Sequence, residues 1–97
     1  MNFTFHPEAR EEFIEAIAYY ESARGGLGLE FSREIHSTIN RVVERPLAWA
    51  LISENTRRCL AKRFPYGVIY EVLEDGILII GITQLNREPG YWRNRTK

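Results

Sequence analysis

The spacing of the hydrophobic residues changes once along this sequence, and that change limits the folds that the chain can adopt. Up to Pro46 the apolar residues recur every three or four positions, the period of an amphipathic helix. After Asn55 they alternate or form short continuous runs, which is typical of strands. Helices followed by several strands indicate an α+β fold. Because 97 residues are enough for one modest core, we expect a single domain over residues 1–97.

Two helices are expected in the first half, and each has recognisable ends. The first begins near Pro7, since proline fits the first turn of a helix, and ends at Gly25-Gly26, where glycine can adopt a left-handed cap. The second runs from Leu27 or Gly28 to Arg45 and is stopped by the proline that follows. Because the glycine link is short, the two helices are expected to form an antiparallel hairpin. Their apolar stripes are Ala9, Phe13, Ile17 and Tyr20 on the first helix and Phe31, Ile35, Ile39 and Val42 on the second.

Four strands are expected around this hairpin. A short β segment, residues 3–5, precedes the first helix, and the others fall at residues 57–62, 66–73 and 77–82, with residues 46–55 as a connection. Glu74-Asp75-Gly76 is a turn signal, and the run that follows is apolar on both faces, which places it inside the sheet. The predicted order is β-α-α-β-β-β, in which the helical hairpin packs on a mainly antiparallel, twisted sheet.

The charges are divided unevenly between the two halves, although the net charge is zero. The first 55 residues carry five arginines and nine glutamates, whereas the remaining residues carry six arginines and two lysines against four acidic residues. This asymmetry indicates either a cationic surface for an acidic partner or nucleic acid, or two halves that attract each other within one fold.

Several classes of site are not indicated. The single cysteine, Cys59, cannot form an internal disulfide, and no spacing matches a zinc site, a phosphate-binding glycine loop or a dinucleotide fingerprint. We therefore expect no cofactor and no metal. No apolar run is long enough to cross a bilayer, and the first residues do not resemble a signal peptide. The expected location is the reducing cytoplasm, away from membranes.

Basic and aromatic residues gather around the predicted strands and in the C-terminal tail. Because antiparallel strands bring their ends together, these side chains are expected to converge into one surface patch. Arginine beside an aromatic ring can bind phosphate and an unstacked base, and it is also favoured where proteins bind each other. The alternative is that the charges are solvated and the rings pack on the sheet edge. The residues are Arg57, Arg58, Lys62 and Arg63 near the strands, and Arg87, Tyr91, Trp92, Arg93 and Arg95 in the tail.

The sequence resembles the RelE/ParE superfamily of bacterial toxins over nearly its whole length. The clearest motifs are Arg63-Phe64-Pro65-Tyr66, followed by Tyr70, and Arg87-Glu88-Pro89-Gly90-Tyr91-Trp92, which is similar to the ParE-type ending. In the helical half the resemblance is carried by Tyr19, Tyr20, Gly28, Phe31 and Pro46.

The resemblance implies a toxin of a type II toxin–antitoxin pair, of the kind linked to plasmid stabilization and growth inhibition, with the same β-α-α-β-β-β order. ParE-type members block DNA gyrase by binding it, whereas RelE-type members cleave messenger RNA on the ribosome. A third possibility is a degenerate, non-toxic regulatory partner. The small antitoxin, ParD-like or similar, is expected to neutralise the toxin and to carry any contact with operator DNA.

The interpretation we favour is ParE-like binding, with Arg87, Tyr91 and Trp92 as anchors. ParE-type chains commonly have histidine where this chain has Gln84, and glutamine cannot take up a proton near neutral pH. The expected target-binding residues are Arg57, Arg58, Arg63, Arg87, Tyr91, Trp92, Arg93 and Arg95. If the chain were instead a nuclease, the catalytic candidates would be Arg58, Lys62, Arg63, Arg87 and Tyr91.

The antitoxin is expected to place a helical or partly extended segment over the helical hairpin or over the sheet. An amphipathic segment would place its apolar side chains in a groove between the helices, and some of its contacts with the acidic half would be basic. The candidate residues for this surface are Tyr19, Tyr20, Phe31 and Ile35.

Overall fold

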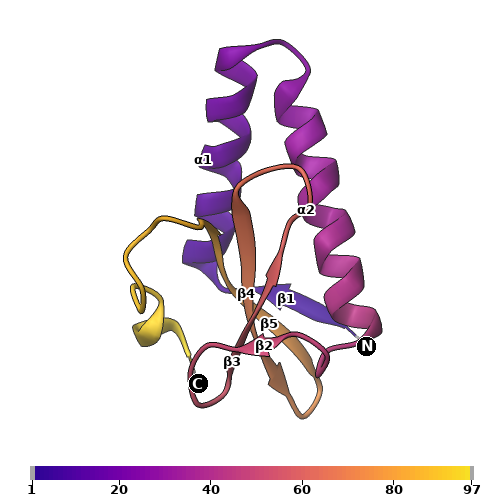
Figure 1. Ribbon diagram of the computed structural model, residues 1–97, viewed down its shortest axis with the longest axis vertical. Coiled ribbons are helices and arrows are strands. Elements are labelled where there is room, and N and C mark those ends of the chain that lie inside the picture. Colours follow the sequence, from indigo (N-terminus) through magenta and orange to yellow (C-terminus); the bar gives the residue numbers. More distant parts are fainter. Residues whose placement is uncertain (1, 97) are drawn as a thin grey trace.

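The computed structural model describes residues 2–96 and has two layers, a helical hairpin and a sheet (Figure 1). The hairpin extends well beyond one end of the sheet, and the C-terminal tail curls back beside the other half of the molecule. The elements in chain order are β1 (Phe3–Phe5), α1 (Pro7–Ala23), α2 (Leu27–Glu44), β2 (Ala50–Leu51), β3 (Thr56–Leu60), β4 (Tyr66–Leu73), β5 (Gly76–Gln84) and a 3-10 helix, η1 (Arg93–Arg95).

The ends of the two helices follow from local chemistry. His6 caps α1, since its Nδ1 accepts the backbone N–H of Glu8 at 3.1 Å. Between the helices, Gly26 adopts a left-handed φ of 89°, and the carboxylate of Glu21 accepts its backbone N–H. The helices then approach so closely that a Cβ on Gly28 would lie 2.7 Å from the carbonyl oxygen of Ile17. The predicted antiparallel hairpin is confirmed.

The sheet has five strands in the order β1-β5-β4-β3-β2. The three long strands β3, β4 and β5 pair antiparallel, whereas β1 pairs parallel with β5. The apolar run of residues 77–82 therefore lies inside the sheet, as predicted from its two apolar faces. Its strand is longer than predicted, and β3 begins one residue earlier and ends two residues earlier.

The two faces of the sheet carry cores of different size. The face toward the helices holds the main core, in which Phe31, Ile35 and Tyr70 are fully buried. The opposite face holds a small cluster of Ile69, Ile80 and Trp92. Because this small core includes a residue from the tail, the tail is part of the folded domain.

Two elements were not predicted. Residues 46–55 contain β2, a two-residue strand in which Ala50 pairs with Arg58 and Leu51 with Arg57. The tail contains η1. Segments this short cannot show a hydrophobic period, so only their tertiary contacts identify them.

Candidate functional site

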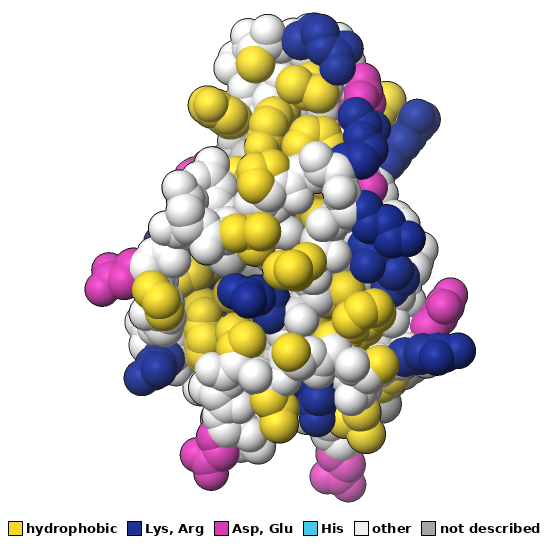
Figure 2. All heavy atoms as spheres, in the orientation of Figure 1, with side chains coloured by type: hydrophobic (Ala, Val, Ile, Leu, Met, Phe, Trp, Pro, Cys, Tyr) yellow, Lys and Arg dark blue, Asp and Glu magenta, His cyan; other side chains and the backbone are white. Residues whose placement is uncertain are grey.

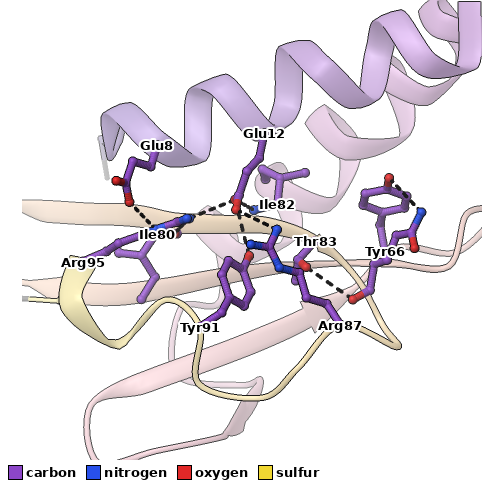
Figure 3. Close-up of polar contacts among 10 residues, drawn as sticks. Glu8, Glu12, Tyr66, Ile80, Ile82, Thr83, Arg87, Tyr91 and Arg95 are labelled. Carbon is purple, nitrogen blue, oxygen red and sulfur yellow. Dashed lines mark hydrogen bonds and ion pairs between the residues drawn. The ribbon is translucent and has the colours of Figure 1, made fainter.

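The tail is fixed to the edge of β5 by the carboxylate of Glu12, on α1 (Figure 3). Strand β1 ends at Phe5, so β5 lacks a partner strand beyond Ile79 on that edge. There the backbone N–H of Ile82 donates to Glu12 Oε1 at 3.2 Å, and the guanidinium of Arg95 donates to the carbonyl oxygen of Ile80 at 3.0 Å. Side chains from α1 and the tail thus supply the hydrogen bonds that a neighbouring strand would have made.

The same carboxylate binds two arginines of the tail. Arg95 Nη1 lies 3.0 Å from Glu12 Oε1, and Arg87 Nη1 lies 3.3 Å from Oε2. Arg95 also pairs with Glu8, with Nε 2.8 Å from the carboxylate. Burial alone would lower the pKa of Arg95, but the hydrogen bond and charge of Glu12 outweigh it, so its pKa is raised and it stays charged. The side chain of Arg95 is only 8% exposed, which makes this a largely buried ion pair.

Tyr91 lies between the two guanidinium groups. The Cζ atoms of Arg87 and Arg95 are 3.8 and 4.9 Å from the centre of its ring, and its hydroxyl contacts Glu12 at 3.4 Å. A Cβ on Gly81 would lie 2.8 Å from this hydroxyl, so glycine is required for the ring to reach its place. Burial raises the pKa of Tyr91 above its ordinary value, and the charge of Glu12 raises it further. We call Glu8, Glu12, Arg87, Tyr91 and Arg95 the tail cluster.

A cavity beside the tail cluster brings together other predicted residues. It has a volume of about 140 Å³ and lies between the strands and the tail; we call it the tail pocket. Arg58 and Arg93 are exposed residues in its lining. Trp92 also lines it but is only 4% exposed, because its ring fills the small core. Trp92 therefore packs the tail onto the sheet through the small core. The prediction that it is an exposed anchor for the target is wrong.

The single patch predicted for all the basic residues does not form. Arg63 pairs instead with Glu30 of α2 at 2.8 Å, and the backbone N–H of Lys62 donates to Glu34. Arg57 is half-buried and donates to two backbone carbonyls of the connection, those of Leu47 and Trp49. Arg63 and the backbone of Lys62 are thus held against α2, and Arg57 is held against the connection before β3, so none of the three lines the tail pocket.

The predicted antitoxin surface requires a similar correction. Phe31 and Ile35 are fully buried between the hairpin and the sheet, so they cannot receive a partner's side chains. Tyr20 is half-buried, and its ring stacks on Phe31 with centroids 4.9 Å apart. Tyr19 is 63% exposed. The helical periodicity identified the stripe that faces the core; the exposed apolar residues that it missed are Ile14 and Leu29.

A groove of about 430 Å³ lies between α1 and the meeting ends of β4 and β5. Tyr19 and Glu15 line it from the helix, and Tyr66, Gln84 and Arg87 line it from the sheet and tail. The amide nitrogen of Gln84 lies 3.5 Å from the Tyr66 hydroxyl. The groove therefore combines aromatic surface with both signs of charge; we call it the α1 groove.

Two further structural findings concern metals and membranes. In residues 2–96 the structure has no group of three or more histidine, cysteine or acidic side chains placed to hold a metal ion. Neither of the described helices combines the length and the apolar character that a membrane span requires.

Comparisons with known proteins bear on the family. The family model described as the ParE toxin of the type II toxin–antitoxin system parDE matches residues 3–88. A solved structure described as the chromosomal ParDE toxin–antitoxin system from P. aeruginosa is similar in fold, with a TM-score of 0.76 and 17% sequence identity over 87% of this chain and 95% of that chain. No curated protein matches the chain. Because the family model covers most of the sequence, the chain belongs to the ParE toxin family of type II toxin–antitoxin systems.

Proposed function

We propose that this protein is a toxin that inhibits DNA gyrase by binding it in the cytoplasm, and that it is neutralised by a ParD-like antitoxin. The observation that carries the proposal is the tail cluster. In it Glu12 holds Arg87 and Arg95 and contacts the hydroxyl of Tyr91, the group of the tail that could transfer a proton. Such a tail is built to present a fixed surface. Binding requires a fixed surface, whereas cleavage of RNA requires a group that accepts a proton.

The alternative, cleavage of messenger RNA, has weaker chemical support. Attack by a ribose hydroxyl needs a base, but Gln84 cannot act as one, and the raised pKa of Tyr91 keeps its phenol protonated near neutral pH. Lys62 and Arg63 lie next to carboxylates of α2, away from the tail cluster. The cations and the proton acceptor that a nuclease would use are thus not gathered in one place.

A supercoiling assay tests the proposal. Purified toxin added to gyrase holoenzyme and relaxed plasmid is expected to reduce supercoiling in proportion to its concentration. Unchanged supercoiling over a wide range of toxin concentration would overturn the proposal. Induction of the toxin in cells without antitoxin separates the alternatives. Cleaved reporter transcripts on ribosomes would indicate a nuclease, and the absence of growth arrest would indicate a non-toxic regulatory protein.

For the antitoxin we propose the outer surface of α1, where Tyr19 and Ile14 are exposed, together with the α1 groove. An amphipathic segment could place apolar side chains on these residues and a basic side chain near Glu15. Operator DNA would be bound by the antitoxin alone. Toxin and the product of the neighbouring gene are expected to co-elute in gel filtration, and Tyr19→Ala is expected to weaken that complex. Separate elution of the two wild-type proteins would overturn this part of the proposal.

A further inference from the structure

The tail pocket opens on the face of the sheet that the helices leave uncovered. Ile52, Ile69 and Trp92 give it apolar walls, and Arg58 and Arg93 supply guanidinium groups. Figure 2 shows hydrophobic side chains gathered around basic ones over the half of the molecule in which Figure 1 places the strands. The tail cluster lies at the edge of β5. The tail pocket and the tail cluster share Arg87 and Tyr91, and their other residues differ.

Among the residues that the structure describes, Arg58 has no partner for its charge. Within residues 2–96, no ion pair or hydrogen bond is made by the guanidinium of Arg58 or of Arg93, in contrast to Arg87 and Arg95. Glu88 is the only carboxylate in the described lining of the pocket, and it pairs with neither of them. An unpaired guanidinium at the wall of a pocket can donate two hydrogen bonds to a carboxylate of another molecule and bind it strongly.

The position of Arg58 is set by a glycine. A Cβ on Gly67, on the neighbouring strand β4, would lie 3.1 Å from both Cγ and Cδ of Arg58. Without that Cβ, the aliphatic stem of Arg58 lies flat across β4, on the side where Leu85 also approaches Gly67. Leu60 and Leu85 are both exposed. The face therefore offers a cation between apolar side chains.

These features favour a protein over a nucleic acid as the occupant. The ring of Trp92 is almost fully buried in the small core, and the half-buried ring of Tyr91 lies against the guanidinium groups of Arg87 and Arg95, so little ring surface is left on which a base could stack. A cavity of about 140 Å³ suits one inserted side chain. Two unpaired cations match a single carboxylate better than the repeated charges of a nucleic-acid backbone.

We infer that the tail pocket is the docking point for the target, and that it receives a segment of the target protein in which an acidic side chain stands between apolar ones. The inference rests on the proposed function and makes it more specific. Arg58 binds the carboxylate, Leu60 and Leu85 contact its apolar neighbours, and the hairpin with the α1 groove is left for the antitoxin.

The test compares variants of the full-length toxin in the gyrase supercoiling assay, with antitoxin binding measured in parallel. Arg58→Glu is expected to raise the toxin concentration needed for half-inhibition by about 30-fold or more, because the attraction to the target's carboxylate would become a repulsion. Arg58→Lys keeps the charge but loses the planar fork, so a smaller loss is expected. Gly67→Ala leaves Arg58 in the chain but displaces its stem, and it should also weaken inhibition. Arg10→Glu, which changes an exposed arginine of α1, is the matched control and should inhibit like the wild type.

The outcomes separate this inference from the proposed function. If the wild type does not inhibit gyrase, the proposed function fails and the inference fails with it. If the wild type and Arg58→Glu inhibit equally, or if Arg58→Glu loses only antitoxin binding, the inference alone is overturned. Loss of inhibition with antitoxin binding and melting temperature unchanged supports it. Loss of both partners at an unchanged melting temperature would overturn it, because the pocket would then not be a docking point for the target that is separate from the antitoxin surface.

Discussion

Two glutamates in this toxin each bind two arginines, yet they do so in opposite surroundings. Glu12 holds Arg87 and Arg95 in the tail cluster, where the side chain of Arg95 is almost fully buried. Glu30 holds Arg24 and Arg63 near the tip of the hairpin, where both arginine side chains are about 60% exposed. We call the second group the hairpin cluster.

The difference in burial gives the two clusters different roles. In the hairpin cluster water screens the charges and competes for them, so the pairs contribute little to stability. In the tail cluster Glu12 and Arg95 are largely withdrawn from water, whereas Glu8 and Arg87 stay about half exposed. The carboxylate of Glu12 also receives a backbone N–H from β5. Loss of Glu12 there leaves the buried Arg95 with only the half-exposed Glu8 as a partner. The tail cluster therefore determines whether the tail stays on the sheet, and the hairpin cluster only holds a loop near a helix.

The largest expected effect is that of Glu12→Gln. Removing the charge leaves Arg95 buried beside a neutral amide, which we expect to lower the free energy of unfolding by about 3 kcal/mol, a large part of the total for a small domain. Urea denaturation measures the change, and trypsin should then cleave the tail at its arginines faster than in the wild type.

Glu30→Gln is the matched variant in the hairpin cluster, and we expect it to unfold at nearly the same urea concentration as the wild type. Equal destabilisation by Glu12→Gln and Glu30→Gln would mean that burial does not separate the two clusters.

A smaller effect is expected from crowding the ring of Tyr91. In Gly81→Ala the added methyl group would lie 2.8 Å from the Tyr91 hydroxyl, so the ring must shift away from Glu12. We expect a loss of about 1–3 kcal/mol, measured by thermal unfolding. In Gly25→Ala, beside the hairpin tip, the nearest atom would be 4.0 Å away, and the change should stay within about 0.5 kcal/mol. A Gly81→Ala protein as stable as the wild type would show that the tail cluster tolerates a displaced ring.

The smallest effect concerns pH. Hydrogen bonds from Arg63 and Arg24 lower the pKa of Glu30 below its ordinary value. A carboxyl whose pKa is lower in the folded protein contributes stability above its unfolded pKa and loses that contribution as the pH falls through its folded pKa. The slight advantage of the wild type over Glu30→Gln should therefore be present near pH 7 and vanish on acidification, as followed by melting temperature. An advantage that persisted at pH 2 would contradict this assignment.

Much of the fold could be predicted because the relevant signals are local. Pro7, Gly25-Gly26 and Pro46 mark the ends of the helices, and the change of hydrophobic period separates helices from strands. Tyr66–Leu73 was predicted with the bounds that the structure has. The strand at Ala50–Leu51 was not, because two residues have no period.

The site was predicted less completely. Arg87, Tyr91 and Arg95 were identified as functional candidates and do meet in the structure, but the residue that joins them, Glu12, was not identified. In the sequence Glu12 is one of several glutamates in the first turns of a helix, and nothing local distinguishes it from Glu11. Its partner Arg87 is 75 positions away.

The sequence by itself determined the order of the elements, the helical hairpin and the membership in a toxin family, because these depend on periodicity, chain-breaking residues and short motifs. Only the tertiary structure decided which charges neutralise each other and which remain free. A guanidinium pairs with whatever carboxylate the fold brings within about 4 Å, and that distance depends on how the whole chain is packed. For this reason Arg95 became a buried support, whereas Arg58 has no charged partner within residues 2–96. The sequence had placed Arg95 in the tail and Arg58 in a predicted strand, with nothing local to indicate this difference.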